Sequence, residues 1–101
     1  MKMLLVIFRE SLDEDIRRLL RDLNLKAFTE APKVLGIGEA GRASDTYDHP
    51  GFNSLILSAL ENDQAGQIIA SLKTFRNELS RKQQGAKIPL RVFVLPCEQV
   101  L

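Results

Sequence analysis

The chain has 101 residues, which is close to the commonest size of a single domain, and we expect residues 1–101 to form one domain. Its 14 Lys and Arg residues nearly balance 13 Asp and Glu residues, which argues against binding nucleic acid or a membrane through bulk charge. A single cysteine, Cys97, excludes an intramolecular disulfide and any paired-cysteine metal or redox motif.

The first apolar run, residues 3–8, predicts a buried strand with both faces covered. Six residues are too few to span a membrane, and the run lacks the length and the small-residue cleavage site of a signal peptide. We therefore expect a cytoplasmic protein without membrane insertion.

The next segment predicts a helix that begins at Ser11. Ser11 and Glu14 have the spacing of a capping box, and acidic residues precede basic ones along the segment, as the helix dipole favours. This order permits ion pairs between Asp13 and Arg17 and between Glu14 and Arg18. The apolar stripe of this helix consists of Leu12, Ile16, Leu19, Leu20 and Leu23.

Three further segments predict strands. Residues 26–35 contain Pro32, which cannot donate to a sheet ladder and therefore indicates an edge strand. Residues 52–60 are rich in Leu and Ile and contain no proline. Residues 88–95 contain Pro89 and are followed by Pro96, so we expect a second edge strand there.

Between the last two strands the pattern predicts a second helix. Asn62 or Asp63 can cap its start, and Gly85 can end it. Its apolar stripe consists of Ala65, Ile68, Ile69, Leu72, Phe75 and Leu79, and its C-terminal half carries the basic residues Lys73, Arg76, Arg81 and Lys82.

The order strand, helix, strand, strand, helix, strand predicts an α+β ferredoxin-like βαββαβ sandwich. In this fold a four-stranded antiparallel sheet carries two helices on one face, with the first and third strands in the centre. The other face would then be bare, and its apolar residues suggest that a second copy covers it.

A glycine-rich segment follows the second strand. Gly36, Gly38 and Gly41 match the G-x-G-x-x-G pattern, but no helix pattern follows, which excludes a dinucleotide fingerprint. Residues 36–51 are long for a hairpin connection, so both a plain connection and a mobile ligand or partner loop remain open. Arg42 is a candidate for an anion contact within this loop.

The basic residues Lys82, Lys87 and Arg91 bracket the turn before the last strand. They can either meet an anionic ligand or form a solvated basic helix end. The only histidine, His49, has Asp45 and Asp48 nearby, which are too few ligands to predict a metal site. No catalytic arrangement emerges, and we expect Cys97 to be a small apolar residue rather than a nucleophile.

The segment 34–38, Val-Leu-Gly-Ile-Gly, leads into the long loop between the second and third strands. With the order of elements and the chain length, it resembles the PII-like signalling proteins over nearly the whole chain. That resemblance implies trimers with inward-facing sheets, nucleotides bound in clefts between subunits, and a partner-binding T-loop at the position of residues 36–51. Residues 81–87 lack the glycine-rich phosphate signature of PII proteins, which argues against ATP binding of the PII kind.

The resemblance implies a homotrimeric regulatory protein, not an enzyme, that binds a nucleotide or other small anionic effector and signals to a protein partner through loop 36–51. The expected ligand-binding residues are Gly36, Gly38, Gly41, Arg42, Lys87 and Arg91, with no metal and no assigned cofactor. An ACT-like ligand-binding domain or a CutA-like metal-tolerance trimer would have a similar sequence pattern. A small enzyme with His49 as base is a third alternative.

Overall fold

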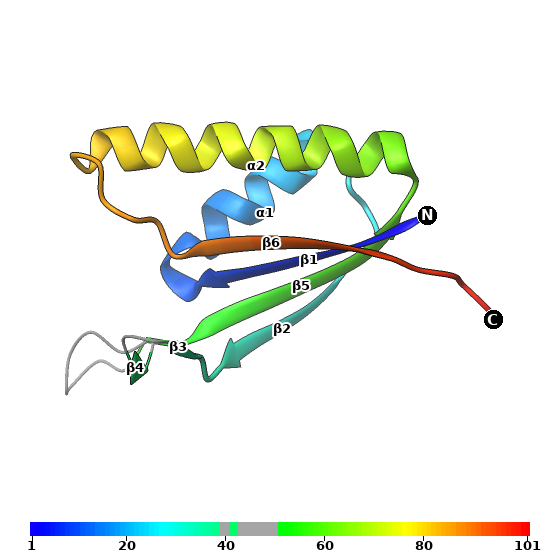
Figure 1. Cartoon of the computed structure of the whole chain (residues 1–101), viewed down its shortest axis with the longest axis horizontal. Helices are drawn as coiled ribbons and strands as arrows, with labels where there is room; N and C mark the ends of the chain where they lie inside the picture. Colours follow the sequence, from blue (N-terminus) through cyan, green and yellow to red (C-terminus); the bar gives the residue numbers. More distant parts are fainter. Residues whose placement is uncertain (39–40, 43–50) are drawn as a thin grey trace.

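The computed structural model describes residues 1–38, 41–42 and 51–101. A four-stranded antiparallel sheet has the order β2-β5-β1-β6 (Figure 1). The elements are β1 (Lys2–Arg9), a short 3-10 turn (Glu10–Leu12), α1 (Asp13–Asp22), β2 (Thr29–Val34), β3 (Ile37–Gly38), β4 (Gly41–Arg42), β5 (Asn53–Leu60), α2 (Asn62–Lys82) and β6 (Leu90–Pro96). No helix in this described part is both long and apolar enough to cross a membrane.

The predicted α+β ferredoxin-like fold is confirmed. The proline-free strands β1 and β5 occupy the centre of the sheet, and the proline-bearing strands β2 and β6 form its edges. On one side of an edge strand, the backbone N–H and C=O groups have no neighbouring strand to bond. A proline, which has no N–H, therefore loses little hydrogen bonding at such a position. The two edge strands are shorter than predicted, because β2 starts at Thr29 and β6 starts at Leu90.

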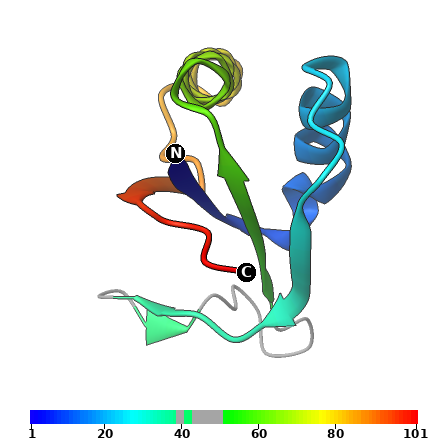
Figure 2. The ribbon, with the colours of Figure 1, turned by 90° about the vertical axis from the view of Figure 1, so that its right-hand side faces the viewer.

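Both helices cover the same face of the sheet (Figure 2). Strand residues alternate between the two faces, so Leu4, Val6 and Phe8 of β1 point toward the helices and are almost fully buried. The rest of this core comes from both helices and the adjoining strands: Leu12, Ile16, Leu20, Leu25, Ile56, Leu60, Ala65, Ile68, Leu72, Ile88 and Leu90.

The predicted helix caps are wrong at both N-termini. Ser11 lies inside the 3-10 turn, and the N-cap residue of α1 is Leu12, with no side-chain hydrogen bond. A capping side chain needs extended backbone at the cap position, which a residue inside a 3-10 turn does not have. In α2 the extended cap position falls on Glu61, one residue before Asn62, and again no side chain caps the helix.

Both helices end in the same backbone motif. Leu25 N–H donates to the Leu20 carbonyl of α1 at 2.9 Å, and Gly85 N–H donates to the Ser80 carbonyl of α2 at 2.8 Å. These bonds define a Schellman ending, which needs one residue in the left-handed region. That residue is Asn24 (φ 61°) after α1 and Gln84 (φ 60°) after α2. Gly85, the predicted stop of α2, follows Gln84, is also left-handed (φ 82°) and donates the closing hydrogen bond.

The face of the sheet away from the helices is apolar. Leu5 of β1 pairs with Leu57 of β5 and with Phe93 of β6, which places three apolar side chains in one row across the sheet. Leu57 is 37% exposed and Phe93 is 47% exposed. We call this surface the open face; its apolar residues are Met3, Leu5, Ile7, Leu55, Leu57, Ala59, Phe93 and Leu95.

Candidate functional site

The glycine-rich segment begins as a short two-stranded ribbon. Ile37 of β3 pairs with Arg42 of β4, and Gly38 pairs with Gly41, so Gly36 lies at the base of this ribbon. The remainder of the loop, residues 39–40 and 43–50, lies outside the described residues. The expectations about loop mobility and about His49 therefore also lie outside them.

The ribbon and Arg91 lie at the same end of the sheet. Arg9 N–H at the end of β1 donates to the Pro89 carbonyl just before β6, and Glu10 N–H donates to the Phe52 carbonyl just before β5. However, the ribbon follows β2 and Arg91 lies on β6, so they occupy opposite edges. Three strand spacings separate the edges by about 14 Å, and one chain does not bring the two groups into one site.

A groove of about 360 Å³ runs between α2 and the edge strand β6. Its apolar walls come from both elements, and three cationic residues line it: Lys73 and Arg76 of α2, and Arg91 of the edge strand β6, which pairs with Ile7 and so belongs to the open-face side of that strand. We call it the basic groove. Its other lining residues are Ile69, Leu72, Leu90, Val92, Phe93 and Val94.

The helical repeat explains why the basic groove is charged. Lys73 and Arg76 are three residues apart, which places them on one side of α2, next to Ile69 and Leu72. No carboxylate lines the groove, and none in the described ranges 1–38, 41–42 and 51–101 pairs with Lys73, Arg76 or Arg91. Uncompensated cations beside an apolar wall suit an anion that also carries an apolar group.

Sequence reasoning identified one of the three cations. Arg91 lines the basic groove, whereas Lys87 is exposed on the turn before β6 and does not line it. From the sequence, Lys73 and Arg76 have only the role of complementing the helix dipole. Their three-residue spacing next to the apolar stripe could also have predicted a charged groove beside the core. In the described part of the chain, no group of three or more His, Cys, Asp or Glu residues could hold a metal ion.

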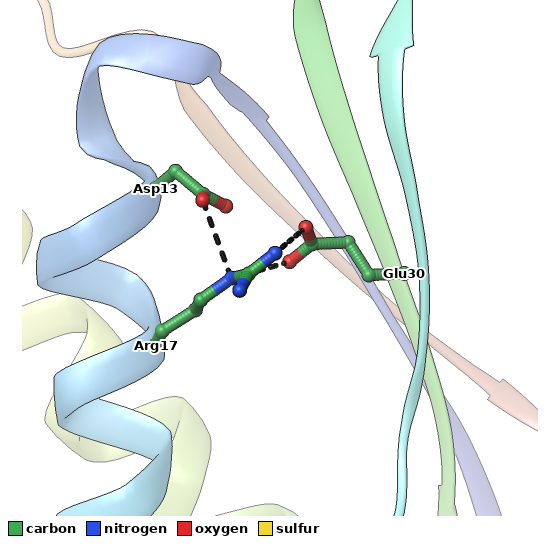
Figure 3. Close-up of polar contacts among 3 residues, drawn as sticks. All are labelled: Asp13, Arg17 and Glu30. Carbon is green, nitrogen blue, oxygen red and sulfur yellow. Dashed lines mark hydrogen bonds and ion pairs between the residues drawn. The ribbon is translucent and has the colours of Figure 1, made fainter.

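A second charged cluster joins α1 to β2 (Figure 3). Arg17 of α1 donates through Nε to Glu30 Oε1 at 3.2 Å and through Nη2 to Glu30 Oε2, and its Nε also lies 3.2 Å from Asp13 Oδ2. The predicted Asp13–Arg17 pair is therefore confirmed. The predicted Glu14–Arg18 pair is wrong, because Arg18 lies 3.6 Å from Asp15 instead.

Two carboxylates share one guanidinium in this cluster. Burial raises the pKa of Asp13 above its ordinary value of 3.8, and the negative charge of Glu30 raises it further, while Arg17 lowers it. The pKa of Arg17 is raised, chiefly by its hydrogen bond to Glu30. Because both carboxylates already pair with Arg17, the cluster holds an edge strand to a helix and offers no free cation to an anionic ligand.

Comparisons with known proteins give matches among solved structures. No family model and no curated protein matches the chain. A structure of CPII, a nitrogen regulatory PII-like protein from Thiomonas intermedia K12 bound to ADP, AMP and bicarbonate, shares 22% identity with a TM-score of 0.58, over 92% of this chain and 86% of that one. Another CPII structure, bound to ADP and bicarbonate, shares 17% identity with a TM-score of 0.62, over 93% and 84%.

A structure described as that of a PII-like signalling protein from Thermus thermophilus also matches. It shares 15% identity with a TM-score of 0.58, over 93% of this chain and 83% of that one. The resemblance drawn from the sequence is thus confirmed at the level of the fold, which this chain shares with PII-like proteins across nearly its whole length.

Proposed function

We propose that this chain is a PII-like regulatory protein rather than an enzyme. It assembles as a homotrimer in the cytoplasm, binds a small anionic effector in the clefts between its subunits, and signals to a protein partner through loop 36–51. The observation that carries this proposal is the basic groove, in which Lys73, Arg76 and Arg91 lie against an apolar wall, with no carboxylate among the described lining residues.

The chemistry of the basic groove suits an adenine mononucleotide. An adenine ring can pack against the apolar wall, which includes Ile69, Val92 and Val94, while a planar guanidinium binds two phosphate oxygens at once. CPII, which has the same fold, is bound to ADP, AMP and bicarbonate. Since residues 81–87 lack a glycine-rich phosphate loop, the cations of the groove would supply the positive charge here.

A trimer would combine two elements that one chain keeps apart. The open face exposes apolar residues from three neighbouring strands, and burying this area against other copies is favourable. With the sheets facing inward, the edge strand β2 of one subunit would lie near β6 of the next. The glycine ribbon of one chain would then border the basic groove of its neighbour, and an effector there would contact the base of loop 36–51.

Calorimetric titration of the purified protein with ADP, AMP and bicarbonate tests the proposal. We expect saturable binding of at least one of them, and binding about 10- to 100-fold weaker for Arg91→Gln, since a hydrogen bond to a charged group contributes about 1.5–3 kcal/mol. The matched control is Arg81→Gln, because Arg81 is exposed at the C-terminal end of α2 and does not line the groove.

The substitution Gly38→Val tests the role of the ribbon. It should weaken effector binding while leaving the melting temperature nearly unchanged, because Ile37, the ribbon residue next to it, is 73% exposed. Absence of binding to all three ligands, or equal binding by Arg91→Gln and Arg81→Gln, would contradict the effector site. Unfolding of Gly38→Val with normal binding by its folded fraction would make the loop purely structural.

A further inference from the structure

A second groove lies on the helix side of the molecule, between α1 and α2. It has a volume of about 530 Å³ and is open to solvent. Figure 2 shows the two helices over different halves of the sheet, and they do not pack closely enough to close the space between them. Leu19, Leu23 and Phe75 line this groove and are only partly buried, although each also packs against the core.

The rim of this groove is acidic. Asp15 and Asp22 of α1 and Glu78 of α2 line it, with Arg18 as the only cation among its described lining residues. Arg18 lies 3.6 Å from Asp15, so within the described part of the chain one of these carboxylates is compensated and two are not. We call this the acidic groove; its remaining lining residues are Ala70, Ser71 and Thr74.

We propose that the acidic groove is the docking site for a basic amphipathic helix of a partner protein. The partly exposed leucines and Phe75 offer an apolar floor, and the carboxylates of Asp22 and Glu78, one on each wall, select for lysine or arginine beside the apolar residues of the incoming helix. The charge of the rim disfavours an acidic helix in the same position.

The dimensions fit a short helix. The α2 wall runs from Ala70 to Glu78, a rise of about 12 Å at 1.5 Å per residue. This length matches two turns, which present apolar residues at positions i, i+3 or i+4, and i+7. The surface area buried by such a short helix is small compared with that of a stable interface. Small interfaces are typical of transient complexes, so we expect a partner that dissociates rapidly.

The acidic groove does not depend on the proposed effector site. It faces away from the open face, so it would stay accessible when copies of the chain cover that face. It also shares no lining residue with the basic groove. If the peptide-binding test fails, the proposed effector function is not contradicted. If effector binding fails, the proposed helix-docking site is not contradicted.

The test uses the full chain and two synthetic helical peptides of about 14 residues, or four turns. One carries leucines at i, i+4 and i+7 flanked by lysines, and the other has glutamates in place of the lysines. Fluorescence anisotropy should show binding of the lysine peptide and at least about tenfold weaker binding of the glutamate peptide. Backbone amide shifts on binding should map to residues 15–23 and 70–78.

A pair of variants locates the site. Thr74→Lys places a cation and added bulk in the groove and should weaken binding of the lysine peptide about tenfold or more. Asn62→Lys adds the same charge at the exposed first residue of α2, about 12 Å along the helix axis from Ala70 and outside both grooves, and should not weaken it beyond about twofold. Equal binding of the two peptides, equal effects of the two variants, or shifts confined to the open face would overturn the proposal.

Discussion

Arg17 of α1 and Glu30 of β2 form a two-pronged ion pair that joins the first helix to an edge strand (Figure 3). The Glu30 side chain is only 9% exposed, whereas Arg17 remains 55% exposed. The pair lies on the helix side of the sheet, because Glu30 pairs with Ile56, whose side chain belongs to the core. The guanidinium therefore compensates a carboxylate that burial would otherwise penalise.

Replacing Arg17 by Met should destabilise the fold more than replacing Arg18 by Met. The first change leaves the nearly buried Glu30 carboxylate without its partner, while the second breaks only the exposed pair with Asp15. Chemical denaturation of both variants measures the difference. Equal losses would show that the Arg17–Glu30 pair contributes no more than a surface ion pair.

Asp13 should give the protein an unusual dependence on pH. Because its pKa is raised in the folded state, the folded state binds more protons than the unfolded state between pH 3.8 and the raised value. The Asp13 contribution to stability therefore increases as the pH falls through this window, and it is unfavourable at neutral pH.

The variant Asp13→Asn isolates this effect. The free energies of unfolding of the two proteins, measured from about pH 7 down to about pH 3.5, should differ increasingly in favour of the wild type as the pH falls. Other titrating groups largely cancel in this difference. A difference that stays constant, or that moves in favour of the variant at low pH, would contradict the assigned direction.

Leu57→Lys should separate the subunits of the proposed trimer. Leu57 lies on the central strand β5, and a lysine there would place a charge in the middle of the open face, where it would be buried against other copies. Sedimentation velocity should show a trimer for the wild type and a folded monomer for the variant. Val100→Lys, at an exposed position of the C-terminal tail, is the control and should remain trimeric. A monomeric wild type at micromolar concentration would refute the trimer.

Gln84→Gly should stabilise the protein by about 1 kcal/mol, because glycine adopts the left-handed conformation without the strain that a side chain causes. Gln83→Gly is the matched control. Gln83 has φ −102°, so glycine there relieves no strain and should leave stability unchanged or slightly lower. Thermal unfolding compares the three proteins, and a stabilisation shared by both variants would rule out this explanation.

The sequence was sufficient to predict which strands lie at the edges of the sheet, because proline destabilises a central strand. Pro32 and Pro96 lie in β2 and β6, and those are the edges of the sheet. The helix starts were less predictable. Ser11 has suitable chemistry for a cap, but the path from β1 into α1 gives it 3-10 backbone, and this path depends on contacts such as that of Glu10 with Phe52.

The candidate site was only partly predictable. Arg91 is predictable as a ligand-binding residue because it lies near other basic residues in the sequence, yet its neighbours in the groove are Lys73 and Arg76, from the preceding helix. Their approach depends on how α2 lies against β6, which sequence spacing does not specify. The acidic groove shows the same limitation, since it requires knowing the separation between α1 and α2.

One helix, α2, forms a wall of both grooves, with cations on the side facing β6 and Glu78 on the side facing α1. A ligand that displaces this helix from one neighbour necessarily alters its distance to the other. If the two occupants prefer different positions of α2, they are thermodynamically linked, and a nucleotide in one groove changes the affinity of the other for a basic helix. The lysine peptide must then change nucleotide affinity by the same factor.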